Sequence, residues 1–278
     1  MFLSDRTVWA YRYRRGSSAL IVSMPHVGTF VPRAVGRQLT DTAARRDDTD
    51  WHLPRLYDFL GELGATVIAA NHSRYVVDVN RPPDGSNLYP GRDTPLLCPV
   101  ATFHGEPLYP SKKGGEPDAP EIDARLKSVW RPYHRRLAAE IERVRSEFGA
   151  VVLWDAHSIV SEAPRLFEGR LKDFNLGTAD GKSCAPGLAE SLRAALSRQP
   201  GYSSVLNGRF KGGFITRHYG NPAQGIHAVQ MEMAESIYMD EASPYTFRND
   251  LAAGVRPVLR EQLEIALDWV NRHGGARV

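Results

Sequence analysis

Two histidines in this sequence each follow a short apolar run, an arrangement that could bind a metal ion. His26 comes two residues after the run at positions 19–24, and His157 comes three residues after the run at positions 151–154. A histidine at the end of a strand can present its imidazole to a cleft. Taken alone, His26 fits a structural role, bonded to the main chain, equally well. Two histidines in the same arrangement favour a metal site.

Asp50 could supply a third ligand through an oxygen atom. It lies in the cluster Asp47-Asp48-Thr49-Asp50, at the expected start of a long helix. Helix capping explains most of this acidity, but three aspartates in four residues exceed the needs of one cap. With His26 and His157, Asp50 would complete the N/N/O ligand set of a catalytic zinc with an open position. The neighbouring Asp155 could orient the ring of His157.

Glu232 lies in the middle of the apolar run at positions 228–233. Burying its carboxylate without a partner would cost roughly several kcal/mol or force its protonation. Beside an activated water, such a glutamate could accept a proton and later deliver it to a leaving amine. The alternative is a structural ion pair with an arginine.

A polar set occupies residues 74–81, around a strand expected at 75–79. Arg74, Asp78 and Asn80 would share one face of this strand, and Arg81 would begin the loop after it. A guanidinium in this place could bind a substrate carboxylate through two hydrogen bonds or support a developing oxyanion. A structural pair between Arg74 and Asp78 is the alternative.

The segment at residues 211–221 combines glycines with cationic and hydrogen-bonding groups, a composition typical of a substrate loop. Arg217 within it could bind a second carboxylate, and Arg209 just before it is a further candidate. A solvated surface is the alternative for this segment. His134 lies at helical spacing, so we expect it only to pack or to cap a helix.

Apolar runs alternate with longer amphipathic stretches along the chain, which predicts one α/β domain over residues 1–278. Helices should flank the sheet, and the segment between Arg81 and Pro120, rich in Pro, Gly, Asp and Ser, should form a lid or a pocket wall. We expect strands at residues 19–24, 66–69, 75–79, 151–154 and 228–233, and helices near 47–64, 120–148 with a break near Pro132, 186–197 and 244–272.

Composition narrows the classes of function. The chain has 278 residues, a net charge of +3 and no block of like charge, which argues against nucleic acid as a partner. The first fifteen residues contain no hydrophobic stretch, so we expect neither a signal peptide nor a membrane anchor, and a cytoplasmic location. Cys98 and Cys184 should be reduced thiols. Phosphate-binding glycine loops and a nucleophile elbow are absent from the sequence, which argues against nucleotide chemistry and covalent acyl transfer. We expect a small-molecule substrate, and the sequence is compatible with a homo-oligomer.

Five motifs, in this order, resemble the N-formylglutamate amidohydrolase family over about residues 20–240. They are Pro-His-Val-Gly at 25–28, Asp-Thr-Asp-Trp-His at 48–52, Val-Asp-Val-Asn-Arg-Pro at 77–82, Trp-Asp-Ala-His-Ser at 154–158 and Gln-Met-Glu-Met-Ala-Glu at 230–235. The resemblance implies a three-layer α/β/α fold with a central mixed sheet, zinc-carboxypeptidase-like (phosphorylase/hydrolase-like). It also implies hydrolysis of N-formyl-L-glutamate to formate and L-glutamate in histidine degradation.

By the same resemblance, His26 and His157 fall where two zinc-binding histidines belong, Glu232 where the catalytic glutamate belongs, and Arg81 where an arginine polarises a carbonyl or binds a carboxylate. Carboxypeptidases take an acidic ligand three residues after the first histidine. In this sequence that position is Thr29, so the third ligand must come from elsewhere or be absent.

Our hypothesis is therefore a zinc enzyme. A Zn²⁺ held by His26, Asp50 and His157 would polarise the formyl carbonyl and lower the pKa of its bound water, with Glu232 as the base. Arg81 would steady the oxyanion, and the substrate would be bound by Arg217, Arg74, Asn80 and Arg209. The rivals are a related metal amidohydrolase for another N-acyl amino acid or a peptide, and a non-catalytic binding protein of the same fold.

Overall fold

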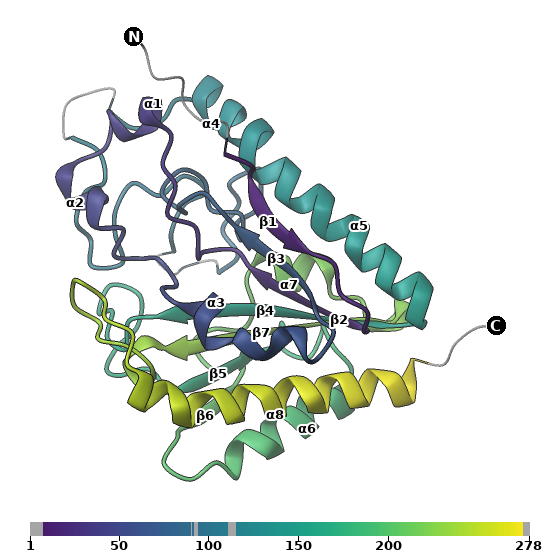
Figure 1. Ribbon diagram of the computed structural model, residues 1–278. Coiled ribbons are helices and arrows are strands. Elements are labelled where there is room, and N and C mark those ends of the chain that lie inside the picture. Colours follow the sequence, from purple (N-terminus) through teal and green to yellow (C-terminus); the bar gives the residue numbers. More distant parts are fainter. Residues whose placement is uncertain (1–7, 90, 92–93, 111–114, 275–278) are drawn as a thin grey trace.

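A seven-stranded mixed sheet forms the centre of the molecule (Figure 1). The computed structural model describes residues 8–89, 91, 94–110 and 115–274. The strand order is β1-β3-β2-β4-β7-β5-β6. The strands are β1 (Tyr11–Arg14), β2 (Leu20–Met24), β3 (Thr66–Ala70), β4 (Val151–Ile159), β5 (Phe174–Gly177), β6 (Ser204–Leu206) and β7 (Ile226–Ala234).

The four central strands β3, β2, β4 and β7 run parallel to one another. Their apolar runs are buried on both faces, as expected for parallel strands covered by helices. β1 is antiparallel to β3, and β5 is antiparallel to β7, so the sheet is mixed. Because β2, β4 and β7 point the same way, their carboxyl ends meet at one edge of the sheet.

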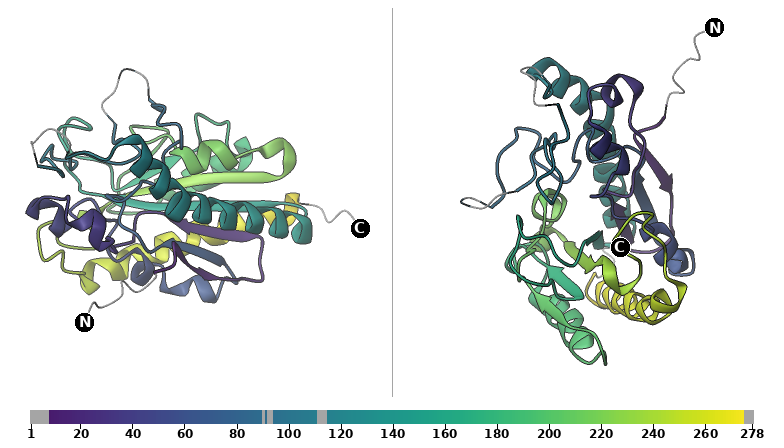
Figure 2. Two further views of the ribbon diagram at one scale, coloured as in Figure 1. Left: turned by 90° about the horizontal axis from the view of Figure 1, so that it is seen from above. Right: turned by 90° about the vertical axis from the view of Figure 1, so that its left-hand side faces the viewer.

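Helices cover both faces of this sheet, giving three layers (Figure 2). On one face, α5 (Arg131–Phe148) packs against β2, β3 and β4, and α7 (Phe214–Tyr219) packs against β4 and β7. On the other face, α3 (Leu53–Leu56) and α8 (Asn249–His273) pack against β4, and α6 (Pro186–Ser197) lies beside α8. The α/β fold with a mixed central sheet is thus confirmed.

The strand predicted at residues 75–79 is wrong. This segment is buried, but it runs through turns and irregular chain without a strand neighbour. Its apolar side chains satisfy the same burial requirement as a strand, and a short apolar run does not reveal which structure buries it.

The long helix predicted near residues 47–64 is also wrong. Only α3 and a 3-10 turn at Asp58–Gly61 form there. His52 precedes α3 with a left-handed φ of 64°, which ends any helix begun at the aspartate cluster. The aspartates therefore lie in a turn and do not cap this helix.

The helix predicted over residues 120–148 is continuous. It consists of α4 (Ala119–Arg125), a π-helical turn (Leu126–Trp130) and α5. The irregularity expected near Pro132 is therefore the π turn that precedes it. α6 has the predicted bounds, and α8 begins five residues later than expected, at Asn249.

Several short elements escaped prediction. β1, β5 and β6 have three or four residues each, and α1 (Arg33–Gly36) and α2 (Asp41–Arg45) are single turns. Residues 1–7, and positions 90, 92–93 and 111–114 of the segment expected to cover the pocket, lie outside the described residues. Among the described helices, none combines the length and apolarity that a bilayer crossing requires.

Candidate active site

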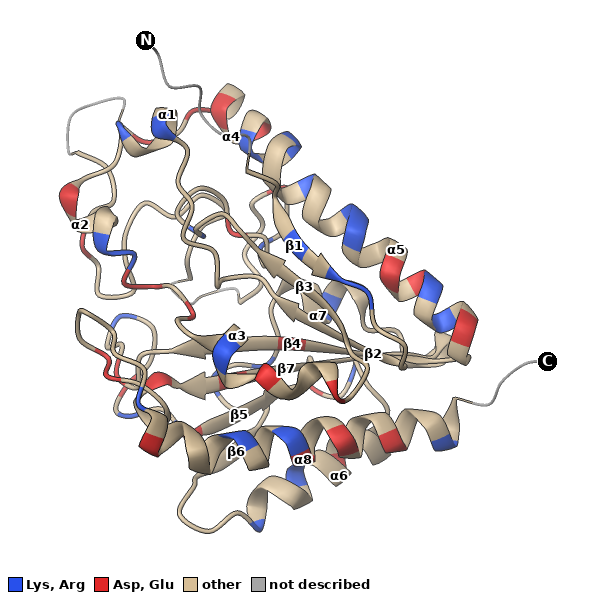
Figure 3. Ribbon diagram, viewed as in Figure 1, with Lys and Arg blue, Asp and Glu red and all other residues tan. Residues whose placement is uncertain are grey.

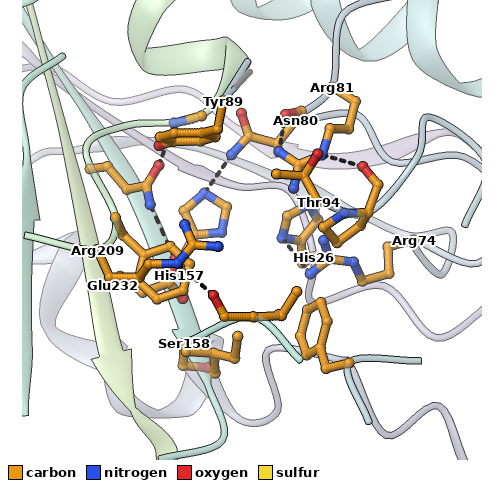
Figure 4. A pocket seen from close by; sticks show the side chains of 17 residues that line it. His26, Arg74, Asn80, Arg81, Tyr89, Thr94, His157, Ser158, Arg209 and Glu232 are labelled. Carbon is orange, nitrogen blue, oxygen red and sulfur yellow. Dashed lines mark hydrogen bonds between the residues drawn. The ribbon is translucent and has the colours of Figure 1, made fainter. Parts of the chain in front are cut away.

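The two histidines come together at the carboxyl edge of the sheet. His26 lies two residues after the end of β2, and His157 lies in the last part of β4, the neighbouring parallel strand. Their rings lie 4.8 Å apart between centroids, inclined at 53°. Both side chains are buried, with exposed fractions of 5% and 2%. Figure 4 shows the pair at the floor of a pocket.

Asp50 joins the two rings from the turn before α3. Its Oδ2 atom lies 3.1 Å from Nδ1 of His157 and 3.7 Å from Nδ1 of His26. The main-chain N–H of Asp50 donates to the carbonyl of His26, which fixes the turn against the end of β2. The three groups together could hold a metal ion, with one ligand atom from each lying within 4.8 Å of the others.

A carboxylate lies close to the second nitrogen of each ring. Nε2 of His26 lies 2.7 Å from Oδ1 of Asp78, and Nε2 of His157 lies 3.0 Å from Oδ2 of Asp155. Asp78 accepts the Nε2 proton of His26, so Nδ1 of this ring presents its lone pair to Arg74 and toward Asp50. Nε2 of His157 also lies 2.9 Å from the amide nitrogen of Asn80, and its Nδ1 is hydrogen-bonded to Oδ2 of Asp50. Two Nδ1 atoms and one carboxylate oxygen form the donor set that zinc prefers in catalytic sites.

The charges around the rings also favour a cation. Burial, followed by the nearby Arg74, lowers the pKa of His26. Burial also acts against protonation of His157, but the carboxylates of Asp155 and Asp50 outweigh it and hold the pKa of His157 well above its usual value. A positive charge between His157 and Asp50 is thus stabilised, whether a proton or a metal ion supplies it.

Arg74 and Asp78 form the buried pair that was the structural alternative for these residues. Nη2 of Arg74 lies 2.6 Å from Oδ2 of Asp78, although no strand carries them. The same guanidinium places Nη1 3.3 Å from Nδ1 of His26. Burial alone would raise the pKa of Asp78, but His26 and Arg74 hold it well below its usual value. Arg74 therefore keeps ionised the carboxylate that orients His26.

Glu232 lies beside His157 on the next strand. The two residues are register partners in the parallel pair β4–β7, and the exposed fraction of Glu232 is 7%. Its carboxylate accepts a hydrogen bond from Nε2 of Gln230 at 3.1 Å. Burial is the main cause that raises the pKa of Glu232 to about 8, with Asp50 adding to it and His157 opposing it.

The alternative for Glu232, an ion pair with an arginine, is not observed. Within the described part of the chain, no basic side chain lies at ion-pair distance from its carboxylate. A buried carboxyl group held only by an amide can exchange a proton at moderate cost.

The pocket above the histidines is lined by both cationic and apolar side chains (Figure 4). It contains ≈ 560 Å³ of space free of protein atoms, part of it open to solvent. Arg74, Arg81 and Arg209 supply its positive charge. The apolar lining comes from Phe103, Ile159, Leu166 and Phe210.

The candidate substrate-binding residues differ in their access to this pocket. Arg81 lines it while donating to the main-chain carbonyls of Pro95 and Asn80, and Arg209 lines it while donating to that of Leu166. Asn80 also lines it: its Oδ1 accepts from the N–H of Ile215, and its Nδ2 lies 2.9 Å from Nε2 of His157 and 3.3 Å from Oδ2 of Asp155. Arg217 is absent from the lining: its guanidinium lies over the ring of Tyr89, 4.9 Å from the centroid.

Sequence reasoning missed the partner of His26 and several pocket walls. Asp78 was paired only with Arg74, because its contact with His26 depends on the fold of an irregular segment. Gln230 could have been found from strand alternation, since residues two apart in β7 share a face with Glu232. Tyr89, Phe103 and Phe210 come from loops and carry no spacing signal.

A model of the N-formylglutamate amidohydrolase family matches residues 18–239. The chain belongs to this family. It is 54% identical to the N-formylglutamate deformylase of Pseudomonas aeruginosa over 257 residues, which are 92% of this chain and 96% of that protein. It is 51% identical to the N-formylglutamate deformylase of Pseudomonas putida, covering 92% of this chain and 95% of that protein.

Solved structures of similar shape agree with this family. The N-formylglutamate amidohydrolase of Ralstonia eutropha JMP134 superposes with a TM-score of 0.77 at 28% identity, over 96% of this chain and all of that one. A gene product of Agrobacterium tumefaciens shares the fold with a TM-score of 0.71 at 18% identity, over 97% and 99% of the two chains. The predicted family is confirmed, and with it an amidohydrolase that acts on an amide bond.

Proposed function

We propose that the protein hydrolyses N-formyl-L-glutamate to formate and L-glutamate, with a zinc ion held by His26, Asp50 and His157. The observation that carries the proposal is the convergence of two Nδ1 atoms and one carboxylate oxygen beside Glu232. Family membership supports the substrate, and the donor set supports the metal.

The residues around the donor set have distinct tasks in this proposal. When bound, a zinc ion polarises the formyl carbonyl and lowers the pKa of a coordinated water. Glu232 accepts the proton as the water attacks and delivers it to the departing amine, because its carboxyl group is buried next to His157 and not committed to an ion pair. Arg81 donates to the oxygen that gains negative charge.

The pocket lining supports a substrate with carboxylates and a short apolar chain. Arg209 and Arg74 provide charge for the carboxylates of glutamate, and Asn80 provides an amide donor. Phe103, Leu166 and Phe210 could contact the methylene groups. Arg217 lies behind Tyr89, so we assign it to the support of that ring rather than to the substrate.

The wider setting follows from the same proposal. Release of formate from N-formylglutamate would be a step of histidine degradation, and we place it in the cytoplasm. Cys98 and Cys184 are free and buried, in agreement with a reducing compartment.

Formate release by the purified protein tests the reaction, the substrate and the metal together. We expect hydrolysis of N-formylglutamate to exceed that of N-formylated amino acids with uncharged side chains. A chelator should abolish it, and added Zn²⁺ should restore it. Hydrolysis that survives metal removal would reject the metal role, and a preference for uncharged substrates would reject the assignment of the arginines.

A further inference from the structure

The segment that carries Asp78, Asn80 and Arg81 is buried chain without a strand neighbour. Residues 75–80 are all buried, yet the ladder bonds of a sheet are not available to them. Buried main-chain carbonyls need hydrogen-bond partners from elsewhere. The groups that supply these partners also fix where Asn80 and Arg81 point.

Side chains from the continuous helix α4–α5 supply three of these partners. Nη1 of Arg125 donates to the carbonyl of Val76 at 2.9 Å. Nε1 of Trp130 donates to the carbonyl of Arg81 at 3.0 Å. Nε2 of His134 bonds to the carbonyl of Val79 at 2.8 Å. We call Arg125, Trp130 and His134 the donor row.

The π turn explains how the donor row lies along one face of the helix. Trp130 follows Arg125 by five residues, and His134 follows Trp130 by four. In an α-helix, residues three or four apart share a face but residues five apart do not. The π turn at Leu126–Trp130 bonds i to i+5 and so adds one residue to that turn. The added residue brings Arg125 and Trp130 onto the same face.

Neighbours fix the ring of His134 in one state. The carbonyl of Val79 can only accept, so Nε2–H of His134 donates to it and Nδ1 accepts from the hydroxyl of Tyr219, 2.9 Å away. The indole of Trp130 stacks on this ring with centroids 3.8 Å apart. Burial lowers the pKa of His134 to about 4, which keeps the ring neutral.

We infer that Trp130 and His134 are positioning residues, which hold the carbonyls on either side of Asn80 and thereby aim Asn80 and Arg81 into the active-site pocket. The inference rests on the proposed function for the role of Arg81. The inference also explains the π turn. Without the added residue, Trp130 would not lie on the helix face from which it donates to the carbonyl of Arg81.

The substitution Trp130→Phe tests this inference, because it keeps an aromatic ring and removes the donor. Trp269→Phe is the matched control: Trp269 lies on α8, stacked on His273 and away from the pocket. We expect W130F to lower kcat at least tenfold with KM changed less than threefold. Amide hydrogen exchange in residues 79–81 should become at least fivefold faster. W269F should leave kcat and this exchange within twofold of the wild type.

A pair of variants at His134 separates the hydrogen bond from packing. His134→Gln retains an N–H that can reach the carbonyl of Val79, and His134→Leu does not. We expect H134Q to keep a kcat at least threefold above that of H134L.

The outcomes also separate this inference from the proposed function. A wild-type protein that does not hydrolyse N-formylglutamate would reject the function, and hydrogen exchange would still decide the positioning role. Exchange in W130F equal to that in W269F would overturn the inference. So would equal kcat values for W130F and W269F, or for H134Q and H134L, in an active enzyme.

Discussion

Each imidazole at the site has a carboxylate near Nε2 and directs Nδ1 toward Asp50, so the location of protons decides the chemistry of the site. Asp78 accepts the Nε2 proton of His26, and Asp155 lies 3.0 Å from Nε2 of His157. Glu232, two strands along from His26, accepts a hydrogen bond from the amide of Gln230 and does not orient a ring. The carboxylates thus divide into groups that orient ligands and one group that can move a proton.

Replacing Glu232 with Gln should remove the base without disturbing the donor set. The amide has the same shape and can still bond to Gln230, but it cannot accept a proton. We expect kcat to fall by about 10²–10⁴-fold, the range typical of general-base removal. Zinc content, measured on the same preparation, should be unchanged. The exposed Glu147→Gln on α5 is the control, and near-normal turnover in E232Q would show that Glu232 is not the base.

Replacing Asp155 with Asn should weaken metal binding rather than folding. Asp155 lies 3.0 Å from Nε2 of His157 and accepts from Oγ of Ser23, and a neutral amide in its place would remove the negative charge beside the ring. Loss of such a partner typically costs about 10–100-fold in metal affinity. Competition with a chelating dye measures the dissociation constant without any substrate. An affinity within twofold of the wild type would mean that Asp155 does not tune His157.

At the scale of elements, the sequence predicted the central strands of the sheet. It did not predict the irregular segments that side-chain contacts hold in the interior. β2, β4 and β7 are apolar, buried on both faces and close to their predicted positions, and they carry or directly precede His26, His157 and Glu232. This is why the candidate ligands could be chosen before the structure was known. Parallel strands ending at one edge then bring them together.

The irregular segments were not predictable for a physical reason. The run at residues 75–79 has the composition of a strand, but helix side chains bond its carbonyls. Arg217 has the composition of a substrate ligand, but α7 directs it to Tyr89. Such outcomes depend on contacts between residues far apart in the chain, which local pattern does not contain.

Because α5 packs against residues 79–81 and buries His134, we expect the free energy of unfolding to fall at acidic pH. His134 titrates near 6.5 when unfolded and at about 4 when folded, mainly because of burial, with His218 lowering the value further and Asp155 raising it. Between these values the unfolded chain binds one more proton. The contribution of neutral His134 to the free energy of unfolding should therefore be fully present above pH 6.5. It should be lost as the pH drops toward 4, a change of about 3 kcal/mol.

Urea unfolding at pH 7, 5.5 and 4.5 measures this contribution. His134→Gln should make the free energy of unfolding depend less steeply on pH between 6.5 and 4. The change in slope should correspond to about one proton taken up on unfolding. Tyr219→Phe is the control, because it removes the hydroxyl at Nδ1 but keeps the buried imidazole, and so keeps most of the pH dependence. A variant H134Q with the wild-type pH dependence would assign the acid sensitivity to other groups.

At the scale of the whole molecule, the exposed charged residues contribute less to stability than the buried sheet does. Residues of both signs are interspersed along α5 and α8 (Figure 3), and several pair within about one turn, as Arg143 does with Glu147. Exposed pairs of this kind contribute little to stability. The structure concentrates its functional charge in the buried groups at one edge of the sheet.

This arrangement predicts that zinc stabilises the molecule globally. The proposed ligands come from the end of β2, the turn before α3 and strand β4, so a metal ion would cross-link segments distant in the chain. A ligand that binds only the folded state adds about 4 kcal/mol to the free energy of unfolding at a thousandfold excess over its dissociation constant. We expect Zn²⁺ to raise the unfolding midpoint of the metal-free protein by several degrees. Mg²⁺ should not do so, because it prefers oxygen ligands. Asp50→Asn should lose most of the gain, and an equal rise in D50N, or with Mg²⁺, would place the stabilising ion outside this donor set.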